Sequence, residues 1–254
     1  MDVPNDEDRA SSAVTARPPQ HVACIMDGSG RWATRRQLSR IEGHGAAEGA
    51  ITAVVDAAIA EGVRWLTLFA FSTENWTRPP DEVAFLMEYN SRLIAKHGAG
   101  YHRRGIRVRY LGRQAEPVPS RLQEEIRRFQ DLTAANSTLN LTLALNYGGR
   151  AELVDAVQRL LLDGTPAALV DEGAIASHLQ YPEMPSPDLI VRTGGERRLS
   201  NFMLWGAAYA ELVFLDVLWP DFRAAHFRSA LEIYERRRRT FGSLGGSHAE
   251  SLNG

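Results

Sequence analysis

The sequence lacks the features that mark secreted and membrane-spanning proteins. Cys24 is the only cysteine, so no disulfide can form within one chain, and a cytoplasmic protein is expected. Because it lies in a short apolar run, Cys24 is predicted to be a buried core residue and not a nucleophile. No segment approaches the ~18 consecutive apolar residues that span a bilayer, and the N-terminus resembles no secretory signal. No transmembrane segment is therefore expected.

An excess of charge of one sign is also missing. The chain has 29 basic and 31 acidic residues and a formal net charge of −2, so no broad basic field for nucleic acid is expected. The four arginines at 236–239 are expected to end a helix, where cations suit the helix dipole. The histidines lack the spacing of a zinc site, and all except His44 are expected to be structural or on the surface.

The chain does have enough apolar sequence for one large core. Its 254 residues are 44% hydrophobic and 24% charged, which is an ordinary balance for a globular domain. Short polar segments bracket this domain. We expect a flexible tail over residues 1–19, a single domain over 20–242 and a second flexible tail over 243–254.

The hydrophobic pattern alternates between strand and helix periods. Strands are predicted at 21–26, 65–71, 106–111, 139–146, 189–192 and 211–214. Helices are predicted at 46–61, 120–135, 149–163, 199–209 and 221–240, and one more begins at a cap formed by Asp81 and weakens near Gly98 and Gly100. This alternation predicts an α/β fold with a central, largely parallel six-stranded sheet flanked by helices.

The first candidate site directly follows the first predicted strand. Ligands of parallel sheets collect at the carboxyl ends of strands, and this end carries Asp27, Gly28, Ser29, Gly30 and Arg31. Glycines let backbone N–H groups approach an oxyanion, an arginine adds a positive fork, and an aspartate can hold Mg²⁺. The alternative is an ordinary turn, because Asp-Gly is common in turns.

Two more polar clusters follow other predicted strands. Segment 71–80 lies between a strand and a helix and indicates either a binding site or a helix-capping loop. In segment 192–201, charge-assisted hydrogen bonds from two arginines and a serine hydroxyl could bind a diphosphate, with a solvated loop as the alternative. The residues concerned are Ser72, Thr73, Glu74, Asn75, Trp76 and Arg78 in the first segment, and Arg192, Arg198 and Ser200 in the second.

Two isolated residues complete the candidates. His44 lies between glycines and could bind a phosphate or move a proton, although a lone loop histidine is more often inert. Glu211 opens an apolar strand and needs a partner, which is either an arginine or a Mg²⁺ shared with Asp27, directly or through a dimer contact. Two anion sites, one metal carboxylate and a large apolar body are what a condensation of prenyl diphosphates requires.

Segment 21–32 resembles the opening motif of the cis-prenyltransferases, the family that includes undecaprenyl diphosphate synthase. Four more blocks are similar in order and spacing: Arg40 with Gly43 and His44, and segments 71–78, 146–150 and 187–222. The resemblance implies an α/β sheet flanked by helices, a homodimer, and a hydrophobic product tunnel between the sheet and two helices. It also implies Mg²⁺-dependent addition of isopentenyl diphosphate to an allylic prenyl diphosphate in the Z configuration, giving a medium- or long-chain product.

The resemblance further implies a role for each matched residue. Asp27 would bind Mg²⁺ and help the allylic diphosphate leave, with Glu211 contributing to the metal site. Either the catalytic Asn75 or an oxygen of the released diphosphate would take the proton, and both readings stay open because a neutral amide is a weak base. The implied substrate-binding residues are Gly28, Ser29, Gly30, Arg31, Trp32, Arg40 and His44 for the allylic substrate, Ser72, Thr73, Glu74, Trp76 and Arg78 around the closing loop, and Arg192, Arg198, Leu199 and Ser200 for isopentenyl diphosphate.

Some positions depart from the family pattern, and other functions are weighed against it. Ser29 replaces the usual asparagine, which puts the rate in question but not the reaction. A short-chain synthase and a non-catalytic partner subunit are alternatives, the latter typically without the metal aspartate or the arginines. A nucleotide-binding dehydrogenase is set aside, because Ala33 stands where the third glycine of its motif would be.

The predicted product tunnel gives an expectation for chain length. Ala70, near the catalytic end of its strand, should leave the tunnel mouth open, and Leu139 should form the floor about 20 Å away. A peripheral membrane contact for release of the product is also expected.

Overall fold

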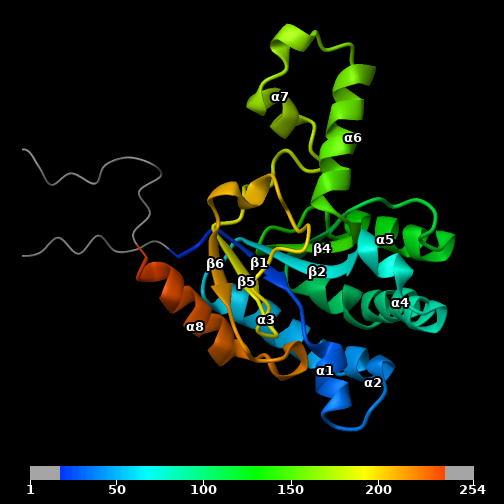
Figure 1. Cartoon of the computed structure of the whole chain (residues 1–254), viewed down its shortest axis with the longest axis vertical. Coiled ribbons are helices and arrows are strands. Elements are labelled where there is room, and N and C mark those ends of the chain that lie inside the picture. Colours follow the sequence, from blue (N-terminus) through cyan, green and yellow to red (C-terminus); the bar gives the residue numbers. More distant parts are fainter. Residues whose placement is uncertain (1–17, 238–254) are drawn as a thin grey trace, which may run out of the picture.

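The computed structural model describes residues 18–237, which build a six-stranded parallel sheet with helices against it (Figure 1). The strand order is β3-β4-β2-β1-β5-β6, and every neighbouring pair is parallel. The α/β prediction is confirmed, and each predicted strand lies within one residue of its expected bounds. The strands are β1 (His21–Ile25), β2 (Trp65–Ser72), β3 (Ile106–Leu111), β4 (Leu139–Tyr147), β5 (Leu189–Arg192) and β6 (Glu211–Phe214).

Eight α-helices and four short 3₁₀ helices are found in the described range. The α-helices are α1 (Ser29–Thr34), α2 (Arg40–Gly45), α3 (Glu48–Ala60), α4 (Pro80–Arg103), α5 (Ser120–Thr133), α6 (Gly149–Leu162), α7 (Glu172–Ser177) and α8 (Ala224–Glu235). The 3₁₀ helices are η1 (Thr73–Thr77), η2 (Ala167–Leu169), η3 (Gly206–Tyr209) and η4 (Trp219–Asp221).

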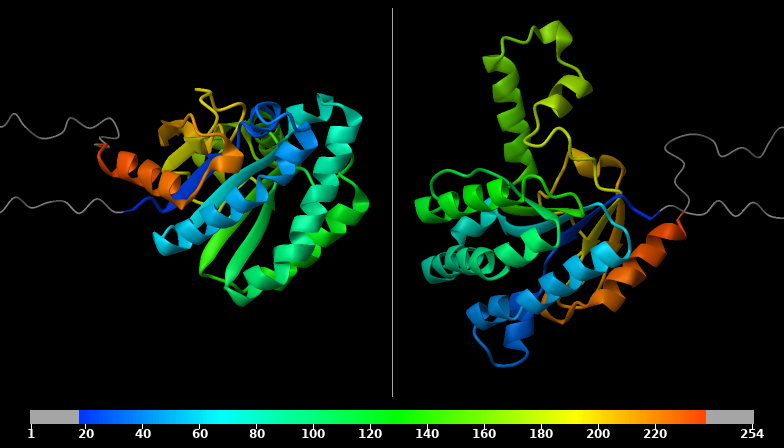
Figure 2. Two further views of the ribbon diagram at one scale, coloured as in Figure 1. Left: turned by 90° about the horizontal axis from the view of Figure 1, so that it is seen from below. Right: turned by 180° about the vertical axis from the view of Figure 1, so that it is seen from behind.

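The strands bury both faces, so their side chains alternate between two cores. Val22 and Cys24 face a large core to which α3, α4, α5 and α8 contribute, and Ala23 and Ile25 face a smaller one. The view from behind in Figure 2 shows α3 and α8 side by side. Cys24 is buried in this core, as predicted, and burial raises the pKa of its thiol to about 12, which disfavours the nucleophilic thiolate.

Helix α4 departs from its predicted ends. It begins at Pro80 with Pro79 as its N-cap, so Asp81 lies in the first turn and is not the cap. It also continues past Gly98 and Gly100 to Arg103. A Cβ atom on Gly98 would be 3.4 Å from the Phe129 ring, which shows that α4 packs closely on α5 there. This tertiary packing outweighs the weak helix propensity of glycine.

The helix predicted at 199–209 is wrong. The segment is irregular except for η3, and Ser200, Asn201 and Met203 have φ values of 50°, 62° and 45°. Left-handed backbone cannot continue a right-handed helix. This segment contributes Phe202 and Met203 to the smaller core, which explains its helix-like apolar pattern.

The chain ends and the projecting helices complete the fold. Apart from residues 18 and 19, the predicted tails lie outside the described residues, as do residues 238–240 of the predicted last helix. Helices α6 and α7 extend away from the sheet (Figure 1). Over residues 18–237, no helix combines the length and apolar character that crossing a membrane requires.

Candidate active site

The carboxyl ends of β1 and β5 mark the point where the strand order reverses. From β1 the chain continues to β2 on one side, and after β4 it adds β5 on the other side of β1. Open parallel sheets bind ligands in the crevice at such a switch point. Asp27 follows β1, Arg192 ends β5, and Ile25 pairs with Arg192 in the sheet. Local topology therefore brings the aspartate and the arginine together.

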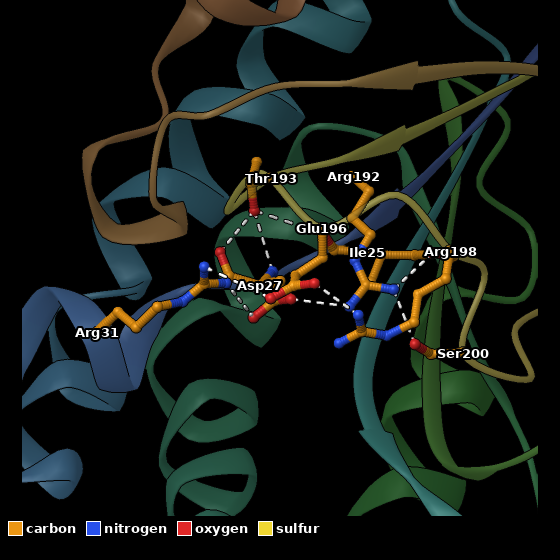
Figure 3. Close-up of polar contacts among 8 residues, drawn as sticks. All are labelled: Ile25, Asp27, Arg31, Arg192, Thr193, Glu196, Arg198 and Ser200. Carbon is orange, nitrogen blue, oxygen red and sulfur yellow. Dashed lines mark hydrogen bonds and ion pairs between the residues drawn. The ribbon is translucent and has the colours of Figure 1, made fainter.

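A partly buried ion pair joins Asp27 to Arg192 (Figure 3). Arg192 Nη2 lies 2.8 Å from Asp27 Oδ2, and the Arg192 side chain is only 5% exposed. Its Nη1 donates to Ser200 Oγ at 2.7 Å and to the Arg198 carbonyl at 2.5 Å. Because a guanidinium is planar, these contacts fix its orientation. The structure thus places Asp27, Arg192 and Ser200 in one cluster.

Two exposed arginines flank this ion pair. Arg31 Nη2 is 3.3 Å from Asp27 Oδ1, and Arg31 Nη1 is 3.8 Å from Glu196. Arg198 Nη1 is 2.5 Å from the other Glu196 oxygen. Exposed pairs of this kind are weak, so both guanidinium groups stay available to an anion.

The turn after β1 is held by Thr193 and requires a glycine. Thr193 Oγ1 accepts a hydrogen bond from the Asp27 N–H at 3.0 Å and donates one to the Asp27 carbonyl at 2.7 Å. Gly28 has a φ of 109°, and a Cβ there would lie 2.8 Å from Leu218. The Asp-Gly turn predicted as the alternative is therefore present, and it presents the Asp27 carboxylate to the arginines.

The loop after β2 borders the cavity on the side of β1 opposite to β5. Asn75 Oδ1 accepts from the Ser72 N–H at 3.0 Å, which starts η1. Glu74 accepts from Asn201 Nδ2 at 2.8 Å, linking this loop to the segment that carries Ser200. Burial alone would raise the pKa of Glu74, but the hydrogen bond from Asn201 helps to lower it. The capping interpretation is confirmed for η1, and because Ser72, Glu74 and Asn75 line the cavity, the binding-site interpretation stays a prediction.

A buried carboxylate accepts hydrogen bonds from two arginines and a histidine beside the site. The Glu82 side chain is 5% exposed. Its carboxylate accepts hydrogen bonds from Arg40 Nε at 2.9 Å, His44 Nε2 at 3.0 Å and Arg78 Nη1 at 3.0 Å. Burial alone would raise the pKa of Glu82, but the hydrogen bonds from Arg40 and His44 and the arginine charges lower it to about 2. The pKa of His44 is lowered, chiefly by burial, against the opposing effect of Glu82.

A cavity of about 630 Å³ runs from this polar edge into the large core. Its mouth is lined by charged and polar groups such as Asp27, His44 and Arg192. Its body lies between the sheet and helices α3 and α4 and is mainly apolar, with one face of α4 supplying a helical stripe. The stripe consists of Leu86, Tyr89, Asn90, Leu93, Ile94, His97 and Tyr101, and the sheet side includes Ala70, Tyr110, Leu141 and Leu143.

The predicted site residues divide into those that line the cavity and those that support it. The lining includes Asp27, Ser29, His44, Ser72, Glu74, Asn75, Arg78, Arg192, Arg198 and Ser200. Beside it lie Gly28, Gly30, Arg31, Trp32, Arg40, Thr73, Trp76 and Leu199. Two tryptophans serve neighbouring contacts instead: Trp32 Nε1 donates to Asp221 and Trp76 Nε1 donates to Asn146, each at 2.8 Å.

Glu211 lies away from Asp27 within one chain. It pairs with Leu189 at the start of β5, three residues before Arg192, so it is displaced by about 10 Å along the strands and further across them. Its carboxylate is 2.7 Å from Arg237 Nη1. The prediction that Glu211 and Asp27 of one chain directly share a metal ion is therefore wrong. The predicted alternative, an arginine partner for Glu211, is present. Sharing across a dimer stays a prediction.

The sequence patterns do not predict four residues of the site. Glu82, Thr193, Glu196 and Asn201 were assigned no role, although all four contact predicted residues. The one local signal is that Arg78 and Glu82 are only four residues apart, on either side of the start of α4. Leu139, expected as the tunnel floor, is fully buried but is not among the cavity-lining residues.

Comparison of the sequence with known proteins finds relatives that belong to one family of enzymes. Residues 25–242 match the family described as putative undecaprenyl diphosphate synthase. A trans,polycis-polyprenyl diphosphate synthase, (2Z,6E)-farnesyl diphosphate specific, from Thermobifida fusca is 47% identical over 89% of this chain and 84% of its own length. A decaprenyl diphosphate synthase from Mycobacterium tuberculosis is 42% identical over 89% of this chain and 78% of its own length.

Solved structures agree with the sequence relatives. Lavandulyl diphosphate synthase from Lavandula x intermedia, in complex with dimethylallyl diphosphate, superposes with a TM-score of 0.84 at 32% identity, covering 89% of this chain and 99% of that one. A probable undecaprenyl diphosphate synthase from Campylobacter jejuni gives 0.76 at 29% identity, with the same coverage.

Proposed function

Because this chain belongs to the family of putative undecaprenyl diphosphate synthases, we propose that it is a Mg²⁺-dependent cis-prenyltransferase. It condenses isopentenyl diphosphate with an allylic prenyl diphosphate and leaves a Z double bond. The cavity carries this proposal, because its polar mouth suits diphosphates and its apolar body suits a hydrocarbon chain.

The two diphosphates occupy different parts of the mouth. Arg40, His44 and Arg78, near the loop after β1, hold the allylic diphosphate, and Arg31 stays available to it. Arg198 and Ser200 hold isopentenyl diphosphate, with the Arg192 guanidinium between the two sites. Arginine forks match phosphate oxygens in pairs, which supports this assignment.

The Asp27 carboxylate fits a magnesium ion that takes most of its ligands from substrate. Among residues 18–237 no three potential metal-ligating side chains cluster. Mg²⁺ is commonly held by one or two carboxylates together with substrate phosphates and water, so one carboxylate beside a diphosphate site suffices. When bound, the ion would neutralise the charge that develops on the leaving diphosphate.

The reaction makes and breaks bonds in a defined balance. The allylic C1–O bond breaks and its electron pair leaves with the diphosphate, C1 bonds to C4 of isopentenyl diphosphate, and a proton leaves C2. The Asn75 oxygen accepts from the Ser72 N–H, which orients an amide that has little basicity of its own. We infer that an oxygen of the released diphosphate takes the proton while Asn75 positions the reacting groups.

The product, assembly and location follow from the same proposal. A medium or long polyprenyl chain fits the apolar body of the cavity, and relatives named for decaprenyl and polyprenyl products support this length. We propose a homodimer that works in the cytoplasm, where its one buried cysteine stays reduced, and that contacts the membrane peripherally to release product.

The direct test uses purified protein with labelled isopentenyl diphosphate, Mg²⁺ and C10, C15 or C20 primers. Chromatography of dephosphorylated products should show chains extended well beyond the primer, with new Z double bonds by NMR, and chelation of the metal should stop extension. No extension with any primer at saturating Mg²⁺ would contradict the proposal and favour a non-catalytic partner subunit.

A further inference from the structure

We propose that Glu82 is a positioning residue whose carboxylate holds Arg40, His44 and Arg78 together as one preassembled site for the allylic diphosphate. This inference rests on the proposed function, because it specifies how one of the two substrates is held. It goes further in giving a purpose to a buried acid beside an anion site, where a negative charge would by itself repel the substrate.

The carboxylate of Glu82 accepts four hydrogen bonds from three side chains. Oε1 receives His44 Nε2 and Arg78 Nη1, both at 3.0 Å, and Arg40 Nη2 at 3.2 Å. Oε2 receives Arg40 Nε at 2.9 Å. Arg40 and His44 come from α2 and Arg78 from the end of η1, whereas Glu82 itself lies in the first turn of α4. One carboxylate therefore fixes the relative position of groups that the backbone alone does not align.

The donors that remain free can still bind a phosphate. Arg40 donates from Nε and Nη2 to Glu82. Its Nη1 lies beside Gly30, since a Cβ atom added to Gly30 would be 2.7 Å from this nitrogen. Arg78 uses one nitrogen for Glu82 and keeps its other N–H donors, whereas a neutral His44 gives its single N–H to Glu82; both residues line the cavity. The glycine loop, the two guanidinium groups and the imidazole thus border one space.

The charge balance favours such an arrangement. Two guanidinium groups against one carboxylate leave a net positive charge, which a diphosphate requires. Without the carboxylate, the two guanidinium groups repel each other and lose their shared acceptor. A preorganised site does not have to pay that ordering cost when substrate binds.

The sign of one measurement separates this role from simple electrostatics. Removing a negative charge beside an anion site should, by Coulomb's law alone, tighten diphosphate binding. Loss of a positioning group should weaken it instead. Glu82→Gln keeps the size of the side chain and one acceptor oxygen but removes the charge and one acceptor, so it tests the two effects against each other.

The experiment measures binding of farnesyl diphosphate with Mg²⁺ by calorimetry and steady-state KM for both substrates in Glu82→Gln, Glu82→Asp and wild type. We expect Glu82→Gln to raise the farnesyl diphosphate Kd and KM by about tenfold or more, to change the isopentenyl diphosphate KM by less than about twofold, and Glu82→Asp to recover part of the loss. The control is Glu88→Gln, which removes an exposed charge from the same helix α4 and should leave both constants unchanged.

Each other outcome has a distinct meaning. Unchanged or tighter farnesyl diphosphate binding in Glu82→Gln overturns the positioning role while leaving the proposed function intact. An equal loss for both substrates, with a lowered melting temperature in both Glu82 variants, overturns it in favour of a purely structural role. Wild-type protein that binds neither substrate and extends no primer overturns the proposed function itself.

Discussion

At the scale of the residue, Asp27 contacts two arginines. A test of its charge must therefore leave its hydrogen bonds to them in place. Asp27→Ala leaves the buried Arg192 guanidinium without its carboxylate partner, whereas Asp27→Asn keeps an acceptor beside Arg192 and removes the charge. We expect Asp27→Asn to lower the rate of the first condensation step by at least about 100-fold at saturating Mg²⁺, because loss of charge stabilisation in metal-assisted departure costs roughly 3 kcal/mol or more.

The measurement is single-turnover formation of the first condensation product, with the melting temperature as a check on the fold. Asp131→Asn, an exposed carboxylate on α5, is the control and should behave like wild type. A rate for Asp27→Asn within about tenfold of wild type would remove the metal role from Asp27.

Arg198 offers a cleaner probe of the isopentenyl diphosphate site than Arg192 does. Arg192 is buried and bonded to Asp27, so changing it disturbs both substrates and the fold, whereas the Arg198 side chain is 59% exposed and its guanidinium contacts Glu196. A charge-assisted contact to phosphate is worth about 1.5–3 kcal/mol. Arg198→Ala should therefore raise the isopentenyl diphosphate KM by about tenfold or more in initial-rate assays. A larger rise in the allylic KM would mean that the two sites are exchanged.

The acid dependence of stability reports on Glu82. Its pKa in the folded protein is about 2, below the ordinary value of 4.5, so its ion pairs stabilise the folded state above about pH 4.5. This contribution is lost as the pH falls from about 4.5 to about 2. Urea unfolding at several pH values should show Glu82→Gln less stable than wild type at pH 7, with the difference shrinking below pH 4.5. A difference that stays constant down to pH 2 would show that the charge of Glu82 is not what stabilises the fold.

At the same scale, the sequence predicted residues that follow strands better than residues that meet through the fold. Asp27, Arg192 and Ser200 could be predicted because strand ends in a parallel sheet share one edge. Glu82 could not, since its three partners converge only when α2 packs beside α4. The site of Glu211 was misplaced for the converse reason: it opens its strand and so lies toward the opposite edge.

At the scale of the element, strands and long helices were predictable and short or irregular segments were not. Each strand shows a compact apolar run, whereas α1, α2 and α7 have six residues each and are too short to show a helical period. The segment 199–209 shows apolar spacing because it covers the smaller core, but its left-handed residues prevent a helix. Ser200 and Asn201 also line the proposed diphosphate site, and local strain is often found at functional sites.

We expect the cavity wall between the sheet and α4 to set the length of the product. Ala70 lines the cavity near its mouth, and Leu141 lines it about 20 Å from the end of β4. Ala70→Leu should fill space early and shorten the product, and Leu141→Ala should deepen the cavity and lengthen it, without loss of the first condensation.

Reversed-phase chromatography of the dephosphorylated products measures both changes. Leu111→Ala, a buried leucine on the other face of the sheet, should lower stability without altering length. If both cavity variants give the wild-type length, the cavity does not hold the growing chain.

At the scale of the whole molecule, the projecting helix α6 and the segment after it leave apolar side chains exposed in a single chain. Along α6 and the segment after it, Val154, Val157, Leu161, Leu162 and Leu169 are between 46% and 85% exposed. Apolar patches of this kind on a projecting element are typical of protein interfaces. We therefore expect α6 to contribute to the proposed homodimer, a contact that would also decide whether Glu211 can reach the site of a second chain.

The double variant Leu161→Glu with Leu162→Glu tests this arrangement, because two buried carboxylates without partners would oppose association. Light scattering during gel filtration should give twice the mass of one chain for wild type and a single mass for the variant. Its condensation rate should fall if the metal site needs Glu211 of a second chain, and stay at the wild-type level if Asp27 suffices.

Leu132→Glu on α5, 49% exposed before substitution, is the control and should remain dimeric. A monomeric wild type that extends primers at full rate would contradict both the dimer and the shared metal site, and would leave Glu211 with Arg237 as its only demonstrated partner in the described range.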